Sequence, residues 1–246
     1  MASSGQHQKE TEANLRVWSR KPLLRAIYDQ FYRRIVALVD PELAGMTLEI
    51  GSGIGNLKAH LPNSLCSDLF HNPWLDLVCD GYELPFRDQS LSHVILFDVF
   101  HHLQAPSAFL AKVERVLKPG GRLIVFDPYV SAASYPVYGM LHHEPVALRR
   151  SIDLEAQPPQ PREYYAAQGN ATRLFFFSRS TMSWAPHWKI FHAEAFSAFS
   201  YLLSGGFSKP AVYSEKRLDR LLALDAKLSR WPRLFGGRCL VGLQLE

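Results

Sequence analysis

Cysteines are few in this chain, and long apolar runs and internal repeats are absent. Its 246 residues include only Cys66, Cys79 and Cys239, whose spacing matches neither a disulfide framework nor a metal-binding motif. No run approaches the roughly 18 consecutive apolar residues that a transmembrane helix requires. The first residues also lack the basic and then apolar layout of a secretory signal. We therefore expect a soluble, cytoplasmic protein without a transmembrane segment.

Charge of one sign is only slightly in excess, and the excess lies in the second half of the chain. The formal net charge is +4, and residues 129–246 hold 14 of the 27 basic and 9 of the 23 acidic residues. The basic residues are scattered, and the stretch 216–220 is typical of a solvated helix face. Contact with nucleic acid or anionic lipid is the alternative, although we expect no nucleic-acid partner. The polar residues 1–11 predict a disordered tail, and residues 12–246 a single domain.

Apolar periodicity predicts an α/β fold. Residues 15–39 carry apolar side chains at helical spacing, with Pro22 suited to a first turn and Pro41 placed to end the helix. From residue 46 onward, short apolar runs alternate with helical segments, as expected for a parallel sheet covered by helices. The expected strands are 46–50, 64–67, 75–79, 92–97 and 121–127, and the expected helices are 55–61 and 106–117.

Regular alternation stops after residue 128, and we expect residues 129–207 to form an inserted cap or lid. A strand at 209–213, a helix at 214–228 and a strand at 237–245 are expected to follow. Within the insertion, residues 174–207 hold ten of the 30 aromatic residues of the chain. These aromatic residues either form a small core of the cap or cover an apolar or ring-shaped acceptor. A dimer seam or a membrane-surface patch is the further alternative.

A glycine-rich turn follows the first expected strand. Gly51, Gly53 and Gly55 alternate after the acidic Glu49, and glycines at this spacing let the backbone turn sharply and approach a ligand. A dinucleotide fingerprint needs its third glycine at position 56, where this chain has Asn56. Glu49 would repel a pyrophosphate, whereas it suits the amino group and sulfonium of S-adenosylmethionine. A purely structural turn is the competing interpretation.

Acidic residues lie at the ends of the five expected strands, where ligands collect in parallel sheets. They are Glu49, Asp68, Asp80, Asp98 and Asp127. Asp68 lies 19 residues beyond Glu49, close to the roughly 20 that place a carboxylate on a ribose hydroxyl pair. Asp80, followed by Gly81, is suited to accept from an adenine amino group. Five like charges at one edge would destabilise an empty fold, so a ligand with several donors is expected there, unless they are solvated loop acids.

Four stretches resemble successive motifs of class I S-adenosylmethionine-dependent methyltransferases of the broad small-molecule, type 11-like family. They are residues 49–55, 80–86, 98–103 and 115–122. The resemblance covers about residues 46–128 and implies a Rossmann-like, seven-stranded, mostly parallel sheet with helices on both faces and an antiparallel last strand.

The same resemblance implies roles for individual residues. Gly51 and Gly53 would lie against the methionine part of the cofactor and Asp68 on its ribose. Leu69 would pack on the adenine, and Asp80 and Gly81 would hold its edge. The chain departs from the family after Asp68, because the link 69–74 is too short for the usual helix.

Catalysis of methyl transfer depends mainly on alignment and on exclusion of water. If the acceptor is a hydroxyl, His102 is the first candidate to remove its proton; a packing role is equally compatible with the sequence, and His101 is more suited to a structural role. The adjacent His142 and His143 lack a third ligand at a metal-binding spacing, so no metal is expected.

The sequence thus predicts methyl transfer from S-adenosylmethionine to a small or medium-sized acceptor, apolar or ring-containing. One alternative is methylation of a macromolecule, either RNA or protein. The other is a non-catalytic, cofactor-binding partner subunit.

Overall fold

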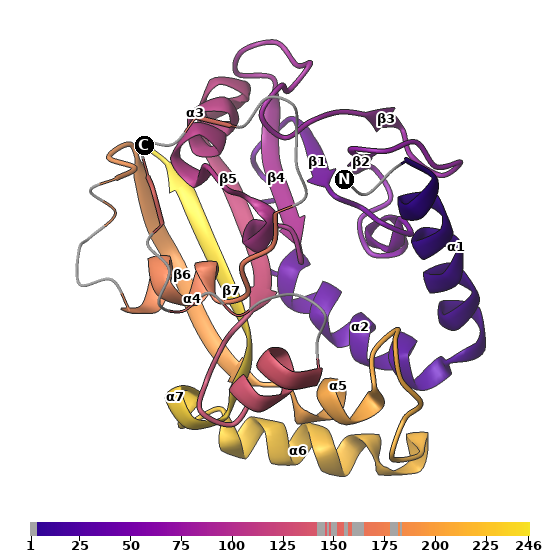
Figure 1. Cartoon of the computed structure of the whole chain (residues 1–246). Helices are drawn as coiled ribbons and strands as arrows, with labels where there is room; N and C mark the ends of the chain where they lie inside the picture. The colour runs from indigo at the N-terminus through magenta and orange to yellow at the C-terminus, as the bar shows by residue number, and fades with distance from the viewer. Residues whose placement is uncertain are drawn as a thin grey trace.

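A seven-stranded mixed sheet forms the centre of the protein (Figure 1). The computed structural model describes residues 4–141, 146, 148, 152–154, 157–158, 165–177, 182 and 184–246. The strands are β1 (Met46–Ile50), β2 (Leu65–Asp68), β3 (Leu77–Val78), β4 (Leu91–Phe97), β5 (Leu117–Pro128), β6 (Trp188–Ser197) and β7 (Gly236–Leu245). Their order in the sheet is β3-β2-β1-β4-β5-β7-β6.

The strands from β1 to β5 pair in parallel, and β7 runs antiparallel to both of its neighbours, β5 and β6. The predicted α/β class, with a mostly parallel seven-stranded sheet and an antiparallel last strand, is confirmed. Because the carboxyl ends of the parallel strands meet at one edge, the residues that follow β1, β2 and β4 are brought together there.

Helices and single helical turns connect the strands. The helices are α1 (Ser4–Arg20), α2 (Pro22–Val36), α3 (Pro106–Val116), α4 (Asn170–Thr172), α5 (Phe199–Ser204), α6 (Leu218–Leu228) and α7 (Pro232–Phe235). The turns are η1 (Asn56–Ala59), η2 (Phe100–His102), η3 (Val137–Leu141), η4 (Arg173–Phe177) and η5 (Glu215–Arg217). Among the described residues, no helix combines the length and apolarity needed to cross a membrane.

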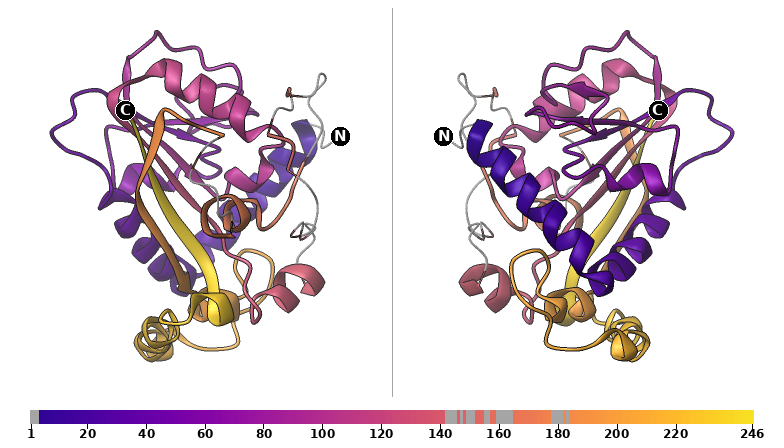
Figure 2. Two further views of the ribbon diagram at one scale, coloured as in Figure 1. Left: turned by 90° about the vertical axis from the view of Figure 1, so that its left-hand side faces the viewer. Right: turned by 90° about the vertical axis from the view of Figure 1, so that its right-hand side faces the viewer.

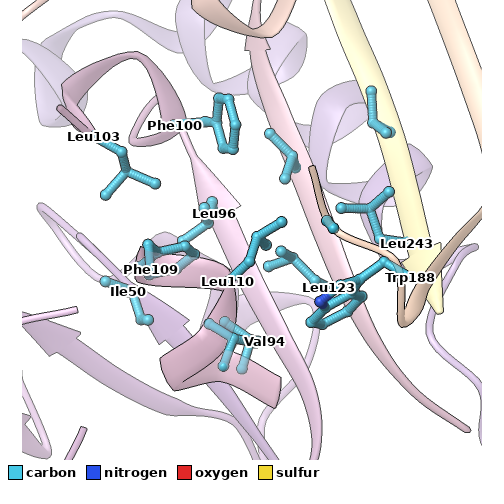
Figure 3. Packing of buried hydrophobic residues seen from close by; sticks show 14 of the residues in the cluster. Ile50, Val94, Leu96, Phe100, Leu103, Phe109, Leu110, Leu123, Trp188 and Leu243 are labelled. Atoms are coloured by element: carbon cyan, nitrogen blue, oxygen red, sulfur yellow. The ribbon is translucent and has the colours of Figure 1, made fainter. Parts of the chain in front are cut away.

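The sheet lies between helices on its two faces (Figure 2), and a hydrophobic core lies on each face; Figure 3 shows residues of the core on the α3 side. Successive side chains of a strand point to opposite faces, so Val94 and Leu96 of β4 pack on the α3 side, with Phe109 of α3. Ile95 and Phe97 of the same strand pack on the α2 side. Each face therefore has its own helix layer, as predicted from the alternating pattern.

The first helical segment differs from its prediction. The expected helix 15–39 is two helices, since Pro22 lacks an amide hydrogen and starts a new helix after Lys21. The helix α1 also begins at Ser4, within the residues whose composition predicts a disordered tail. The expected helix 55–61 is only the four-residue 3₁₀ turn η1.

The sixth strand is where the sequence-based expectation fails. Residues 209–213 form a loop, and β6 lies at 188–197, inside the expected insertion. The segment between β5 and β6 is therefore 129–187. Several of the aromatic residues that were assigned to the insertion belong to β6 instead. Phe196, Tyr201 and Phe207 pack into the α2-side core and Trp188 into the α3-side core, so these residues do not form a separate small core.

Candidate active site

The glycine-rich turn follows β1 at the carboxyl edge of the sheet. Gly51, Gly53 and Gly55 have φ angles of 70°, 53° and 72°, in the left-handed region that favours glycine. A Cβ atom on Gly51 would lie 2.4 Å from Cγ2 of Val99, and one on Gly55 would lie 2.8 Å from Cδ1 of Trp74. No described heavy atom lies within 4 Å of the corresponding position on Gly53. Gly51 and Gly55 thus permit close packing, while Gly53 borders open space that a ligand can enter.

The amides of this turn are used within the protein. The N–H of Ser52 donates to the Ser67 carbonyl (2.9 Å) and that of Gly55 to the Ser52 carbonyl (2.8 Å). The N–H of Gly53 donates to Oδ2 of Asp68 (3.1 Å). A phosphate site needs amides that point at the ligand from a helix N-terminus, and η1 has only four residues. The turn is therefore poorly suited to a pyrophosphate.

Asp68 is the last residue of β2 and links this strand to the turn. Its Oδ2 accepts from Gly53, and its Oδ1 accepts the N–H of Leu69 at 2.7 Å. These two bonds fix the carboxylate at the end of β2, directly beside the glycine turn. The side chain of Leu69 is 44% exposed, as an adenine-packing residue would be before its ligand binds.

The short link after Asp68 supports the turn with side chains in place of a helix. The indole N–H of Trp74 donates to the Gly53 carbonyl (2.8 Å), and the Nδ2 of Asn72 donates to the same oxygen (3.3 Å). The buried Oδ1 of Asn72 has no hydrogen-bond partner among the described residues. Asn72 and Trp74 thus fix the position of the glycine turn. The short link was expected from the sequence, but this role of its side chains was not.

Glu49 lies within β1 and is almost fully buried. Its Oε2 is 3.7 Å from Sγ of Cys66, the donor in that contact. Burial raises the pKa of Glu49 to about 8, and nearby Asp68 adds to this shift. At neutral pH the carboxyl is therefore mostly protonated until a cation comes close. This differs from the permanently charged carboxylate that the sequence analysis assumed.

Asp80 and Gly81 follow β3 and shape the turn after it. Oδ1 of Asp80 accepts the N–H of Tyr82 at 2.9 Å. A Cβ atom on Gly81 would lie 3.0 Å from Cε2 of Phe109, so this glycine allows α3 to approach the strand end. The structure thus supplies a packing reason for Gly81, beside its expected place at the adenine edge.

Asp98 follows β4 and adopts a left-handed conformation, with φ of 56°. Its amide donates to the Phe126 carbonyl of β5 at 2.8 Å. Its carboxylate pairs with the guanidinium of Arg238, from the start of β7. Arg238 is buried and lies 4.5 Å from the ring centre of Tyr201. Arg238 was not predicted as a site residue; its signal in the sequence is a basic residue in a mostly apolar strand.

Two tyrosines of α2 also reach this edge of the sheet. The ring centres of Tyr28 and Tyr32 lie 5.2 Å and 5.1 Å from that of Phe97. Burial raises the pKa of Tyr32, and the carboxylates of Glu49 and Asp98 add to the shift. Tyr32 therefore neighbours both acidic residues. Its place in the helical apolar pattern was predicted, but its proximity to the site was not.

The two histidines of η2 have different partners. Nδ1 of His101 lies 2.9 Å from Oδ1 of Asp127, and both side chains are buried. Nδ1 of His102 lies 2.9 Å from the Tyr165 carbonyl. A carbonyl only accepts, so Nδ1 of His102 carries the hydrogen and the basic lone pair of the neutral ring is on Nε2. The geometry fits a structural role for His101 and gives His102 the tautomer of a proton acceptor.

All five strand-end acidic residues have donors within the chain itself. Cys66 donates to Glu49, Gly53 to Asp68, Tyr82 to Asp80, Arg238 to Asp98 and His101 to Asp127. Donors of the chain thus offset part of the repulsion that the sequence analysis assigned to a ligand, and the ligand stays a prediction. Among the described residues no cluster of metal-ligating side chains is present; His142 and His143 lie outside the described residues.

Comparisons with known proteins agree with this geometry. A family model described as "Methyltransferase domain" matches residues 48–125. The chain is 30% identical over 118 residues to the ubiquinone/menaquinone biosynthesis C-methyltransferase UbiE of Desulfotalea psychrophila, covering 40% of this chain and 48% of that protein. It is 27% identical over 149 residues to an uncharacterized methyltransferase, C1B3.06c, of Schizosaccharomyces pombe, covering 61% and 51%. The chain thus matches about half the length of these relatives.

A solved structure shows the same fold over nearly the whole chain. It is a complex between the Trm112 methyltransferase activator of Haloferax volcanii and a putative methyltransferase, with a TM-score of 0.54 at 16% identity. The match covers 97% of this chain and 94% of the chain in that complex. Residues 48–125 therefore match a methyltransferase domain, and the chain shares its fold with that solved structure.

Proposed function

We propose that this protein transfers the methyl group of S-adenosylmethionine to a small or medium-sized acceptor that is apolar or contains a ring. The observation that carries this proposal is the glycine turn beside Asp68. The amides of Ser52, Gly53 and Gly55 bond within the chain, Gly53 borders open space, and the carboxylate of Asp68 lies beside it. This arrangement suits an adenosyl group with hydroxyl donors better than a pyrophosphate.

The cofactor would lie along the ends of β1, β2 and β3. Gly51 and Gly53 would contact its methionine part and Asp68 its ribose hydroxyls. Leu69 would pack on the adenine, whose edge would meet Asp80 and Gly81. The further residues assigned to this site are the turn glycine Gly55 and the acidic Glu49 and Asp98. When bound, S-adenosylmethionine supplies an electrophilic methyl group on a positively charged sulfur.

The residues of the chain would hold the acceptor and move its proton. Nε2 of His102 would accept the proton of an acceptor hydroxyl, because Nδ1 is already committed to the Tyr165 carbonyl. The buried pair of His101 and Asp127 would keep η2 in place. Alignment of the acceptor and exclusion of water would supply the rest of the rate enhancement.

An apolar acceptor fits the aromatic side chains that follow β5. The ring of Phe176 lies edge-on to that of Tyr129, with centres 5.3 Å apart, and the ring of Phe177 lies 6.2 Å from it. Phe177 is 46% exposed. Exposed and half-buried rings near the carboxyl end of β5 favour an acceptor that gains from apolar or stacking contacts.

Isothermal titration with S-adenosylmethionine, S-adenosylhomocysteine and NADH tests the cofactor. We expect both adenosyl compounds to bind and NADH not to bind. Asp68→Ala should weaken binding by about 1 to 3 kcal/mol through loss of hydrogen bonds to a charged group. Asp88→Ala is the matched control, because that side chain is 74% exposed and pairs with Arg115 at the surface. Preference for NADH, or no adenosyl binding, would overturn the proposal.

The acceptor is identified by incubating the protein with methyl-labelled cofactor and a cell extract. Label in a nuclease- and protease-resistant small molecule supports the proposal. Label in RNA or protein would favour the macromolecular alternative, for which the basic excess of residues 129–246 is the supporting observation. Binding of cofactor with no labelled product in any fraction would favour the non-catalytic partner subunit.

A further inference from the structure

The three most exposed large apolar side chains of the described residues all lie between residues 209 and 234. Val212 is 73% exposed, Trp231 56% and Leu234 52%. A fourth, Leu224 of α6, is 42% exposed. Single exposed apolar side chains are ordinary, but a cluster of the most exposed ones on one segment marks a contact surface.

The same segment is strongly basic. Its seven basic residues are all exposed, and none forms an ion pair within the described part of the chain; they are Lys209, Lys216, Arg217, Arg220, Lys227, Arg230 and Arg233. Of its three acidic residues, only Glu215 and Asp219 are exposed. We call this exposed face of residues 209–234 the α6–α7 surface.

The third acidic residue, Asp225, fixes the orientation of α6. Its Oδ1 accepts from Oγ of Ser197 (2.6 Å) and from the amide of Phe199 (2.8 Å), and its Oδ2 accepts from the amide of Ser200 (3.0 Å). These bonds hold one face of α6 against the junction of β6 and α5. The opposite face of α6 is therefore directed outward.

On that outward face, basic and apolar residues alternate. Arg220, Leu224 and Lys227 lie at spacings of four and three residues, which places them on one side of the helix. Trp231 continues this stripe past the end of α6, where its amide donates to the Leu228 carbonyl. On such a face the apolar side chains can enter the headgroup boundary of a membrane while the basic ones meet anionic headgroups.

The surface lies at one extremity of the molecule, at the bottom of Figure 1, with α6 and α7 outermost. Both views of Figure 2 show the same position. The loop after β5 joins it, because the amides of Ala132 and Ala133 donate to the carbonyls of Arg233 and Leu234. Tyr135 of this loop is 51% exposed. This extremity is the one to which the carboxyl end of β5 leads.

We infer that the α6–α7 surface binds the surface of an anionic membrane. The exposed basic residues complement the negative charge of lipid headgroups, at about 1 kcal/mol each. Val212, Leu224 and Leu234 can enter the boundary between headgroups and acyl chains. Trp231 and Tyr135 have the amphipathic rings that are enriched at that depth.

Other occupants fit less well. A second copy of the chain would bring two basic faces together, which their charge opposes. RNA would satisfy the basic residues but would leave the aliphatic side chains without a partner, since RNA recognition uses stacking rings and charged groups. The alternation of charge with aliphatic side chains therefore favours lipid.

The test is co-sedimentation of the full chain with vesicles, without cofactor or acceptor. One set of vesicles is phosphatidylcholine, and the other is phosphatidylcholine mixed with phosphatidylglycerol. We expect binding to the anionic vesicles only, weakening as salt is raised. Arg230→Glu combined with Arg233→Glu should reduce this binding by about tenfold or more, and Trp231→Ser should also reduce it.

Two control variants make the same chemical changes on other faces. Arg87→Glu with Lys112→Glu changes the net charge equally, and Val78→Ser removes an exposed apolar side chain; both should bind vesicles as the wild type does. Equal losses in test and control variants would overturn the inference, as would equal binding to both kinds of vesicle. The inference would also be overturned if the protein did not bind vesicles and the test substitutions instead abolished its binding to RNA or its self-association. Because no turnover is measured, failure of the proposed methyl transfer leaves this result unaffected.

Discussion

The carboxylate of Asp98 and the guanidinium of Arg238 form an ion pair across the carboxyl edge of the sheet, and only one partner has access to water. The side chain of Arg238 is 3% exposed and that of Asp98 is 29% exposed. Loss of either partner leaves a charge behind, but the cost depends on whether that charge is solvated. The two single substitutions should therefore have unequal effects.

We expect Asp98→Asn to destabilise the protein by about 3 to 5 kcal/mol, because it leaves the buried Arg238 without a countercharge. Asparagine tolerates the left-handed backbone of this position, so backbone strain does not add to the loss. Arg238→Met should cost less, since Asp98 remains partly solvated and methionine can pack on the ring of Tyr201. Urea unfolding at neutral pH measures both values, and a larger loss for Arg238→Met would contradict the argument.

The glycine turn allows packing and ligand contact to be separated. Gly51→Ala places a Cβ atom 2.4 Å from the Val99 side chain, so it should destabilise the fold by clash as well as by strain. Gly53→Ala meets no described atom within 4 Å and should cost only the left-handed backbone strain of about 1 to 2 kcal/mol. It should nevertheless weaken cofactor binding, because its methyl group would enter the ligand space.

Thermal unfolding and cofactor titration of both variants check this prediction. Gly120→Ala is a matched control, since Gly120 also has a positive φ, of 74°, and lies away from the turn. The control should lose stability but keep its cofactor affinity. Unchanged affinity of Gly53→Ala would show that the ligand does not approach this glycine.

The two histidines of η2 should respond in opposite ways. With a hydroxyl acceptor, His102→Gln should lower turnover by about 10² to 10⁴-fold, the usual contribution of a general base, with little change in cofactor affinity. His101→Gln should mainly lower stability, because it removes the partner of the buried Asp127 carboxylate. Turnover, cofactor titration and urea unfolding of both variants separate the roles. Full turnover of His102→Gln would exclude the general base.

The half of the chain that runs from β1 to β5 was predictable because its signals are local. The apolar run before Glu49 and the alternating glycines lie within a few residues of the elements they specify. The strand β4 is buried along its whole length, and the apolar run 94–97 in it is typical of a parallel strand covered on both faces. These features explain why the approximate positions and the parallel direction of the first five strands followed from the sequence.

The later elements were harder because their partners are distant. The strand β6 contains aromatic residues with polar ones between them, a pattern that also fits a cap. Residues 209–213 have strand-like composition, but Pro210 interrupts them, and the amide of Val212 bonds to Leu203 instead of a sheet partner. Asp98 and Arg238 are 140 residues apart, so no local pattern relates them. They come together in the assembled sheet, where β7 lies beside β5.

Glu49 gives the site a dependence on pH whose direction follows from its burial. Its pKa is about 8 in the folded protein, against an ordinary value of 4.5. Between these values the folded state holds a proton that the unfolded state has lost, so the free energy of unfolding should fall as pH rises from about 4.5 to 8. His93 contributes in the opposite direction, since burial lowers its pKa from 6.5 to about 4. Glu49→Gln separates the two contributions, because this substitution should remove the fall in the free energy of unfolding and leave the contribution of His93 unchanged.

The same group should couple cofactor binding to proton release. A cationic amino group or sulfonium near Glu49 favours the ionised carboxyl and lowers its pKa, so binding near neutral pH should release protons and tighten as pH rises toward 8. Calorimetric titration in buffers of different ionisation enthalpy counts those protons. Glu49→Gln should release none and bind with an affinity that no longer depends on pH in this range, while Glu83→Gln, at an exposed position, should behave as the wild type. If Glu49→Gln still releases protons on binding, another group is their source and Glu49 does not lie near the cofactor.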